Sequence, residues 1–150
     1  MTNSRPPKTD SPDSNHSLIR PHVLRLRPGQ DLKLELGTFV RSHQMTAAFV
    51  VAGIGSLQQL SLRLANSQEA TKKKGPFEIL SLQGTLSHEG VHLHLSVADE
   101  KGHCLGGHLL DGCQIFTTAE IMIQELCEFN FQRELDPETG FRELKVLRKP

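Results

Sequence analysis

The chain has 150 residues, of which 37% are hydrophobic and 23% charged, a composition typical of one soluble globular domain. Lysine plus arginine equals aspartate plus glutamate at 17 each, so no net charge attracts the protein to a polyanion such as DNA. The longest fully apolar run, residues 47–52, is far shorter than the roughly 20 residues of a membrane-spanning helix. With no membrane segment or targeting peptide in sight, we expect a cytoplasmic protein, with the nucleus as the alternative location.

Residues 1–17 are rich in proline and serine and contain no apolar residue after Met1 apart from the prolines. Such a segment cannot bury enough surface to offset the entropy lost on ordering, so we expect a disordered tail. The folded domain is expected to cover residues 18–150.

The domain is predicted to begin with one strand and one helix. In residues 22–27 every second residue is leucine or histidine, which predicts a strand that ends at the following Pro-Gly pair. Asp31 then opens a helix whose core-facing residues recur at the helical spacing, at Leu32, Leu36, Phe39, Val40 and His43. No other segment carries a convincing helical period.

Residues 46–52 form a continuous apolar run, which predicts a short strand covered on both faces. Gly53 and Gly55 are expected to end this strand in a turn with positive φ. The same glycines could be a fragment of a phosphate-binding loop, but the third glycine and the following helix of that motif are missing.

Further along, the lysines at 72–74 predict a solvated loop. The strand that follows them is expected to place Leu80, Leu82 and Leu86 on one face. Residues 115–126 tolerate a helix, but their isoleucines, threonines and phenylalanine favour a strand, and we interpret them as one.

The end of the chain, residues 129–147, predicts a closing hairpin around an Asp-Pro-Glu-Thr-Gly turn. Together these patterns predict an α+β fold, in which a mostly antiparallel sheet or partial barrel of seven or eight strands packs with one main α-helix.

The clearest alternation in the chain places His92 and His94 on one face of a strand, opposite apolar neighbours and about 7 Å apart. An Asp-Glu-Lys-Gly turn then folds the chain back, which should bring His108 beside them. Gly106 and Gly107 precede His108 and would leave room for an ion or for a close backbone. Three imidazoles placed in this way can converge on one metal ion, although two alternating histidines are often only solvated polar residues.

Other candidate sites are weaker. A competing Cys/His site could be formed by His103, Cys104, His108 and Cys113, but their spacing fits no standard zinc pattern. Reduced thiols are the simpler interpretation of the cysteines. Glu78 and Glu120 could orient a ligand histidine or act as a general base, but carboxylates at such positions are more often solvated or paired at a subunit interface.

Five blocks of the sequence resemble, in the same order, the signature blocks of the plants and prokaryotes conserved (PPC) domain and span about residues 22–147. These blocks are Pro28-Gly29-Gln30-Asp31-Leu32, Val51-Ala52-Gly53-Ile54-Gly55-Ser56-Leu57, Phe77-Glu78-Ile79-Leu80-Ser81-Leu82-Gln83-Gly84, His92-Leu93-His94-Leu95-Ser96 and Gly106-Gly107-His108-Leu109. The resemblance implies a compact α/β fold that assembles as a homotrimer. It also implies a metal site, which prokaryotic members build at the positions of His92, His94 and His108, and zinc is the ion that three imidazoles plus water suit best.

Plant members of the PPC family carry an AT-hook that enters the minor groove of DNA. Residues 5–7 of this chain are Arg-Pro-Pro and lack the Gly-Arg-Pro core of that hook. We therefore expect direct DNA binding to be weak and indifferent to sequence. The first hypothesis is a zinc-binding module, with a metal-dependent enzyme as one form of it, and the alternatives are a transcription-regulatory adaptor associated with DNA or a purely structural trimerisation domain.

Overall fold

The structure is a computed structural model and describes residues 18–150. The segment predicted to be a disordered tail, residues 1–17, lies outside the described residues. The described part contains eight strands and one helix, which confirms the predicted α+β class. In chain order these are β1 Ile19–Leu26, α1 Leu32–Ser42, β2 Ala48–Arg63, β3 Ala70–Ser87, β4 Gly90–Ala98, β5 Cys104–Leu109, β6 Gln114–Leu126, β7 Phe129–Leu135 and β8 Arg142–Arg148.

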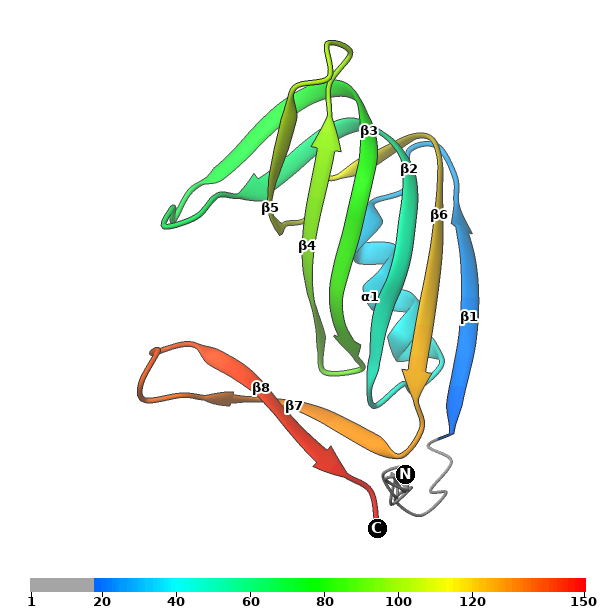
Figure 1. Cartoon of the computed structure of the whole chain (residues 1–150), viewed down its shortest axis with the longest axis vertical. Helices are drawn as coiled ribbons and strands as arrows, with labels where there is room; N and C mark the ends of the chain where they lie inside the picture. Colours follow the sequence, from blue (N-terminus) through cyan, green and yellow to red (C-terminus); the bar gives the residue numbers. More distant parts are fainter. Residues whose placement is uncertain (1–17) are drawn as a thin grey trace, which may run out of the picture.

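Six antiparallel strands form one curved sheet in the order β1-β6-β2-β3-β4-β5 (Figure 1). The last strand, β5, also pairs with the end of β2, so strands β2, β3, β4 and β5 close on themselves as a partial barrel. Strands β7 and β8 pair only with each other, as the predicted closing hairpin, and lie at one end of the molecule (Figure 1).

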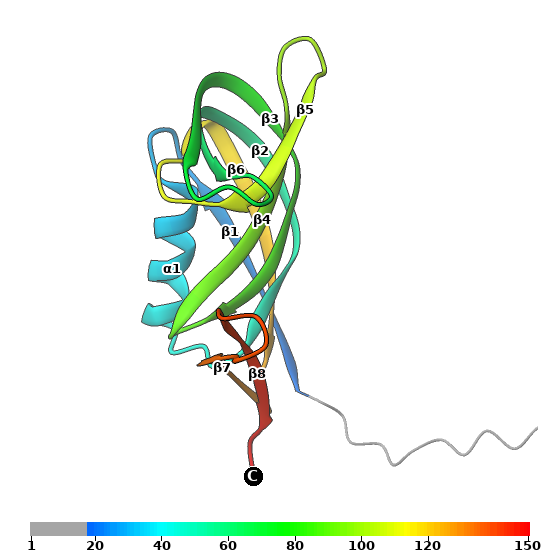
Figure 2. The same cartoon turned by 90° about the vertical axis from the view of Figure 1, so that its left-hand side faces the viewer.

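The single helix covers one face of the curved sheet (Figure 2). Asp31 caps its first turn, because one carboxylate oxygen accepts hydrogen bonds from the backbone N–H groups of Lys33 and Leu34, each at 3.0 Å. Of the predicted stripe, Leu32, Leu36 and Val40 are fully buried, whereas Phe39 is half-buried and His43 is exposed. The three buried residues pack into one hydrophobic core with inward-facing residues of the strands. The helix in residues 18–150 is too short and too polar to cross a membrane.

The predicted break at Gly53 and Gly55 is wrong. Strand β2 is 16 residues long and runs through both glycines. It bends at β-bulges, where its register against β6 and β3 shifts. Gly55 does have positive φ, +138°, and a Cβ there would lie only 2.2 Å from the carbonyl oxygen of Thr118. The bulges also expose Val51, so the apolar run of residues 46–52 is not covered on both faces as predicted.

Two details of β3 also differ from prediction. The lysines at 72–74 lie within the strand rather than in a loop, because they pair with β2 beyond its bulge at Leu57. Leu80 is 52% exposed and does not share the buried face of Leu82 and Leu86. The cause is a bulge between Ile79 and Ser81, which shifts the alternation by one residue.

Candidate metal centre

The hairpin of β4 and β5 brings the three predicted histidines together. In the β4–β5 register His94 lies directly opposite His108, which confirms the pairing expected from the sequence. His92 lies two residues before His94 and therefore on the same face of β4. The apolar residues between and beside them, Leu93 and Leu95, are buried on the opposite face. Burial of these leucines thus fixes the direction in which the histidines point.

The three imidazole rings form a compact triangle. Their centroids are 5.2 Å apart for His92 and His94, 4.9 Å for His92 and His108, and 5.7 Å for His94 and His108. One nitrogen from each ring lies within 4.8 Å of the other two, and no other such group of metal-ligating side chains occurs in residues 18–150. Ligands on a metal with bonds of about 2.0–2.1 Å are separated by less than about 4.2 Å, so only small side-chain movements are needed to close the triangle.

The two glycines before His108 are explained by the backbone rather than by space for an ion. A Cβ at Gly107 would lie 2.7 Å from the carbonyl oxygen of Arg63 on β2, and one at Gly106 would lie 3.1 Å from the carbonyl oxygen of Leu95 on β4. These positions allow β5 to approach both neighbouring strands closely. Of the two interpretations left open by the sequence, close backbone approach is the one that the contacts support.

Burial and positive charge keep two of the histidines neutral. Burial is the main cause that lowers the pKa of His108 to about 4, and the charges of His92 and Arg63 lower it further. The pKa of His92 is also lowered, first by burial and then by the charge of Arg133. At neutral pH both rings are therefore in the unprotonated form that metal binding requires.

His108 also has an unsatisfied polar atom. Its Nδ1 is buried and has no hydrogen-bond partner among residues 18–150. An unpaired buried nitrogen is costly, and a metal ion bound to this nitrogen would satisfy it. The donor chemistry and the geometry of the three histidines therefore fit a divalent metal ion.

The charged residues around the histidines were not identified from the sequence. Arg63, Arg133 and Glu143 line the cavities next to the histidine rings. Arg63 and Arg133 come from strands distant in sequence from the β4–β5 hairpin, and neither carries a local motif, so no sequence signal pointed to them. Glu78 and Glu120, the acids singled out from the sequence, do not line these cavities.

The competing Cys/His site does not form. Cys104 is exposed, whereas Cys113 is buried and its thiol donates a hydrogen bond to the carbonyl oxygen of Ser61 at 3.3 Å. Burial raises the pKa of the Cys113 thiol to about 11, which disfavours the thiolate needed for metal binding. Cys104, Cys113 and Cys127 are all free thiols, as the sequence predicted.

The sequence profile of the Plants and Prokaryotes Conserved (PCC) domain, the same domain as PPC, matches residues 14–127. The chain belongs to this family. A hypothetical protein from Salmonella cholerae-suis (Salmonella enterica) has a similar structure, with 40% identity and a TM-score of 0.87 over 91% of this chain and 99% of the other. A metal-containing protein from Archaeoglobus fulgidus is 27% identical, with a TM-score of 0.72 over 84% of this chain and 93% of the other.

Among curated proteins, the bifunctional protein GlmU from Synechococcus sp. (strain JA-3-3Ab) is 49% identical over 128 residues. The match covers 85% of this chain but only 21% of that protein. The PPC chain described here thus spans about a fifth of the length of the curated relatives it matches.

Proposed function

We propose that this PPC protein is a metal-binding module that holds one divalent ion, zinc, through His92, His94 and His108. The observation that carries the proposal is the triangle of imidazole nitrogens, all within 4.8 Å of one another on one face of the β4–β5 hairpin. The lowered pKa values of His92 and His108 support it, because a metal ligand must be unprotonated.

Zinc is the expected ion because three neutral imidazoles form a nitrogen donor set that leaves a fourth position for water or a ligand. When bound in such a site, zinc polarises a ligand and lowers the pKa of bound water to about 7. The cavity in front of His92 and His108 gives that fourth position access to solvent. The Archaeoglobus protein, which is described as metal-containing, supports a metal in this family without identifying the ion.

Metal analysis and zinc titration of the purified chain test this proposal. We expect one zinc ion per chain and stabilisation by about 2.7 kcal/mol at a free zinc concentration one hundred times the dissociation constant. His108→Ala should lose the zinc and the stabilisation while it keeps the circular dichroism of the parent.

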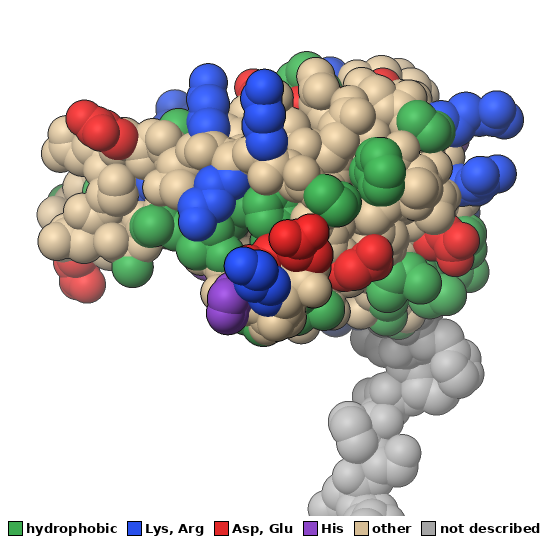
Figure 3. All heavy atoms as spheres, turned by 90° about the horizontal axis from the view of Figure 1, so that it is seen from above, with side chains coloured by type: hydrophobic (Ala, Val, Ile, Leu, Met, Phe, Trp, Pro, Cys, Tyr) green, Lys and Arg blue, Asp and Glu red, His purple; other side chains and the backbone are tan. Residues whose placement is uncertain are grey.

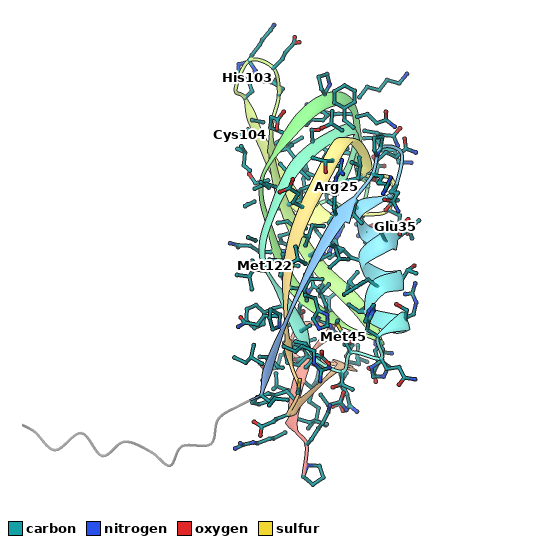
Figure 4. All side chains as sticks on the ribbon, turned by 90° about the vertical axis from the view of Figure 1, so that its right-hand side faces the viewer. Arg25, Glu35, Met45, His103, Cys104 and Met122 are labelled. Atoms are coloured by element: carbon teal, nitrogen blue, oxygen red, sulfur yellow. The ribbon has the colours of Figure 1, made fainter. Side chains whose placement is uncertain are left out.

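The matched control is His103→Ala. His103 lies at the tip of the same hairpin, and its side chain is 75% exposed (Figure 4). The control should bind zinc as the parent does. A parent that takes up no divalent metal, or a His108→Ala variant that binds zinc equally well, would contradict the proposal.

The homotrimer implied by the family resemblance is also proposed here. The sheet face that α1 does not cover carries exposed apolar residues, among them Val23, Ile54 and Met122, and Met122 points away from the helix (Figure 4). Cross-strand pairing places Val23 beside Met122, so exposed apolar side chains are adjacent across β1 and β6. Self-association would remove this surface from water.

The role of a DNA-associated adaptor has less support. On the face drawn in Figure 3, basic and acidic side chains are interspersed rather than gathered into one basic patch. With equal numbers of acidic and basic residues in the chain, few phosphates could be neutralised. Nanomolar binding of the chain to an A/T-rich duplex at physiological salt would favour this role instead.

A further inference from the structure

A cavity of about 840 Å³ lies directly in front of His92 and His108. Strands β2, β4 and β5 of the sheet form one side of it, and the β7–β8 hairpin forms the other. Its charged lining residues are Arg63, Glu89, Arg133, Arg142 and Glu143. Arginines therefore outnumber glutamates in a cavity that opens onto the proposed metal ligands.

Arg63 is placed beside the histidines by the closure of the barrel. In the β2–β5 register it lies directly opposite His108, so the two side chains project from the same face of the sheet. Among residues 18–150 its guanidinium has no ion-pair partner, since none of the six ion pairs there includes it. Its charge is close enough to lower the pKa of both His92 and His108.

Arg133 reaches the same place from the β7–β8 hairpin. Its Nη2 donates a hydrogen bond of 2.7 Å to Oγ1 of Thr85, and Thr85 lies opposite His92 in the β3–β4 register. The remaining donors of this guanidinium have no carboxylate partner in the described part of the chain. Thr85 thus holds Arg133 beside His92 and His94, and the other N–H groups of the guanidinium remain available to a ligand.

The two glutamates of the cavity do not form ion pairs with these arginines, although the charge of Glu143 acts to raise the pKa of His92. Neither Glu89 nor Glu143 forms an ion pair among residues 18–150, and Glu143 instead accepts a hydrogen bond from the hydroxyl of Thr139 at 3.1 Å. Phe141, between β7 and β8, adds apolar surface to the cavity. The cavity therefore combines unpaired guanidinium donors with apolar contacts.

We propose that this cavity binds a small organic carboxylate, whose charged group is held by Arg63 and Arg133 beside the metal and whose apolar part contacts Phe141. The inference rests on the proposed metal site and adds to it the class of ligand. Guanidinium groups bind carboxylates through paired, charge-assisted hydrogen bonds, which are among the strongest polar contacts in proteins. A carboxylate is also an oxygen ligand that zinc accepts, so one group could contact both the arginines and the ion.

The test uses the full chain loaded with zinc and titrated with butyrate, followed by NMR. Butyramide, the neutral amide of the same size, is the matched ligand control, and inorganic phosphate is the matched anion without an apolar part. We expect saturable binding of butyrate with shift changes at Phe141, weaker binding of phosphate and none of butyramide.

Arg63→Gln and Arg133→Gln should each weaken butyrate binding by about tenfold or more, because each removes charge-assisted hydrogen bonds. Arg25→Gln is the matched control, since Arg25 lies on β1 and bonds to Thr118 away from the cavity. The zinc content of every variant is measured in parallel, so that loss of butyrate binding is not confused with loss of metal.

Several outcomes would overturn the inference: no saturable butyrate binding by the zinc-loaded chain, equal binding of butyramide, phosphate binding as tight as butyrate, or unchanged affinity in both arginine variants. Each of these outcomes leaves the zinc site intact. If instead the chain takes up no zinc, the proposed metal function fails, and titration of the metal-free chain with butyrate still decides whether the arginines bind a carboxylate.

Discussion

Lowering the pH should weaken zinc binding by this PPC protein less than it would for three ordinary histidines. Protons compete with zinc for each imidazole, and the competition begins as the pH falls through the pKa of that ring. The sequence alone suggests an onset near 6.5 for all three ligands. Burial of His108 changes that expectation, because it lowers the pKa of this ring to about 4.

The size of the difference follows from the proton-binding equilibrium of each ring. An imidazole with a pKa of 6.5 binds metal about tenfold more weakly at pH 5.5 than at pH 7.5, so three such ligands lose about a thousandfold. A ring with a pKa of about 4 is almost fully unprotonated at both pH values, so it does not add to the loss of zinc affinity. We therefore expect zinc affinity to fall by about a hundredfold at most, and by less if the lowered pKa of His92 also counts.

Equilibrium dialysis against zinc at pH 7.5, 6.5 and 5.5, at one ionic strength, measures this directly. Circular dichroism at each pH establishes that the chain stays folded, and the His103→Ala variant should give the same profile as the parent. A fall of a thousandfold or more between pH 7.5 and 5.5 would show that His108 titrates as an ordinary histidine and would refute the reasoning.

Three further results are expected. In the metal-free protein the unfolded chain binds more protons than the folded one between pH 6.5 and about 4, because the folded-state pKa of His108 is lowered, so the free energy of unfolding in urea should decrease as the pH falls through this window. Gly84→Ala should destabilise the fold by about 2 kcal/mol or more, since Gly84 has a φ of +144° and a Cβ there would lie 2.0 Å from the carbonyl oxygen of His92. Gly102→Ala, at a φ of +80° with open space around it, should cost only about 1 kcal/mol in the same urea experiment. Light scattering should give the mass of a trimer at micromolar concentration, and a monomer would rule out the proposed assembly.

The histidine triangle could be predicted from the sequence because it depends on local geometry. Alternation along β4 fixes the face of His92 and His94, and a short turn fixes the register of the next strand. The observed pairing of His94 with His108 agrees with the approximate register that these two features predict. The helix was predictable for the same reason, since its cap at Asp31 and its apolar stripe are encoded within a dozen residues.

The bulges of β2 and β3 could not be predicted, because a bulge is set by the partner strand rather than by the strand that contains it. Gly55 looks like a strand end in the sequence, yet it lets β2 pass close to the carbonyl oxygen of Thr118 on β6. The bulge between Ile79 and Ser81 likewise depends on pairing with β4 and leaves Leu80 exposed. Such features require knowledge of contacts between residues far apart in the chain.

The arginines around the histidines could not be predicted for the same reason. Arg63 reaches His108 only because β2 pairs with β5, and the missing side chain of Gly107 permits that close pairing. Arg133 lies near His92 because the β7–β8 hairpin packs against the sheet, where its guanidinium bonds to Thr85. The proposed ligands thus come from one local hairpin, but the electrostatic environment that surrounds them is a product of tertiary closure.

The two arginines beside the histidines should couple the binding of zinc to the binding of a carboxylate. The positive charges of Arg63 and Arg133 oppose a divalent cation on the neighbouring histidines, although they also favour the unprotonated imidazoles that the cation needs. A carboxylate between the arginines and the ion would cancel the repulsion and keep the benefit. Zinc and carboxylate should therefore bind cooperatively.

Because coupling between two ligands is reciprocal, saturating butyrate should raise zinc affinity by the same factor by which zinc raises butyrate affinity, and we expect at least about fivefold. Dialysis against zinc with and without butyrate, and titration of butyrate with and without zinc, give the two factors independently. In Arg63→Gln the repulsion is smaller, so zinc binding without butyrate should not weaken and the coupling should decrease. If butyrate instead lowers zinc affinity, the carboxylate competes with the histidines for the ion. The proposal that one carboxylate contacts both the arginines and the ion would then be wrong.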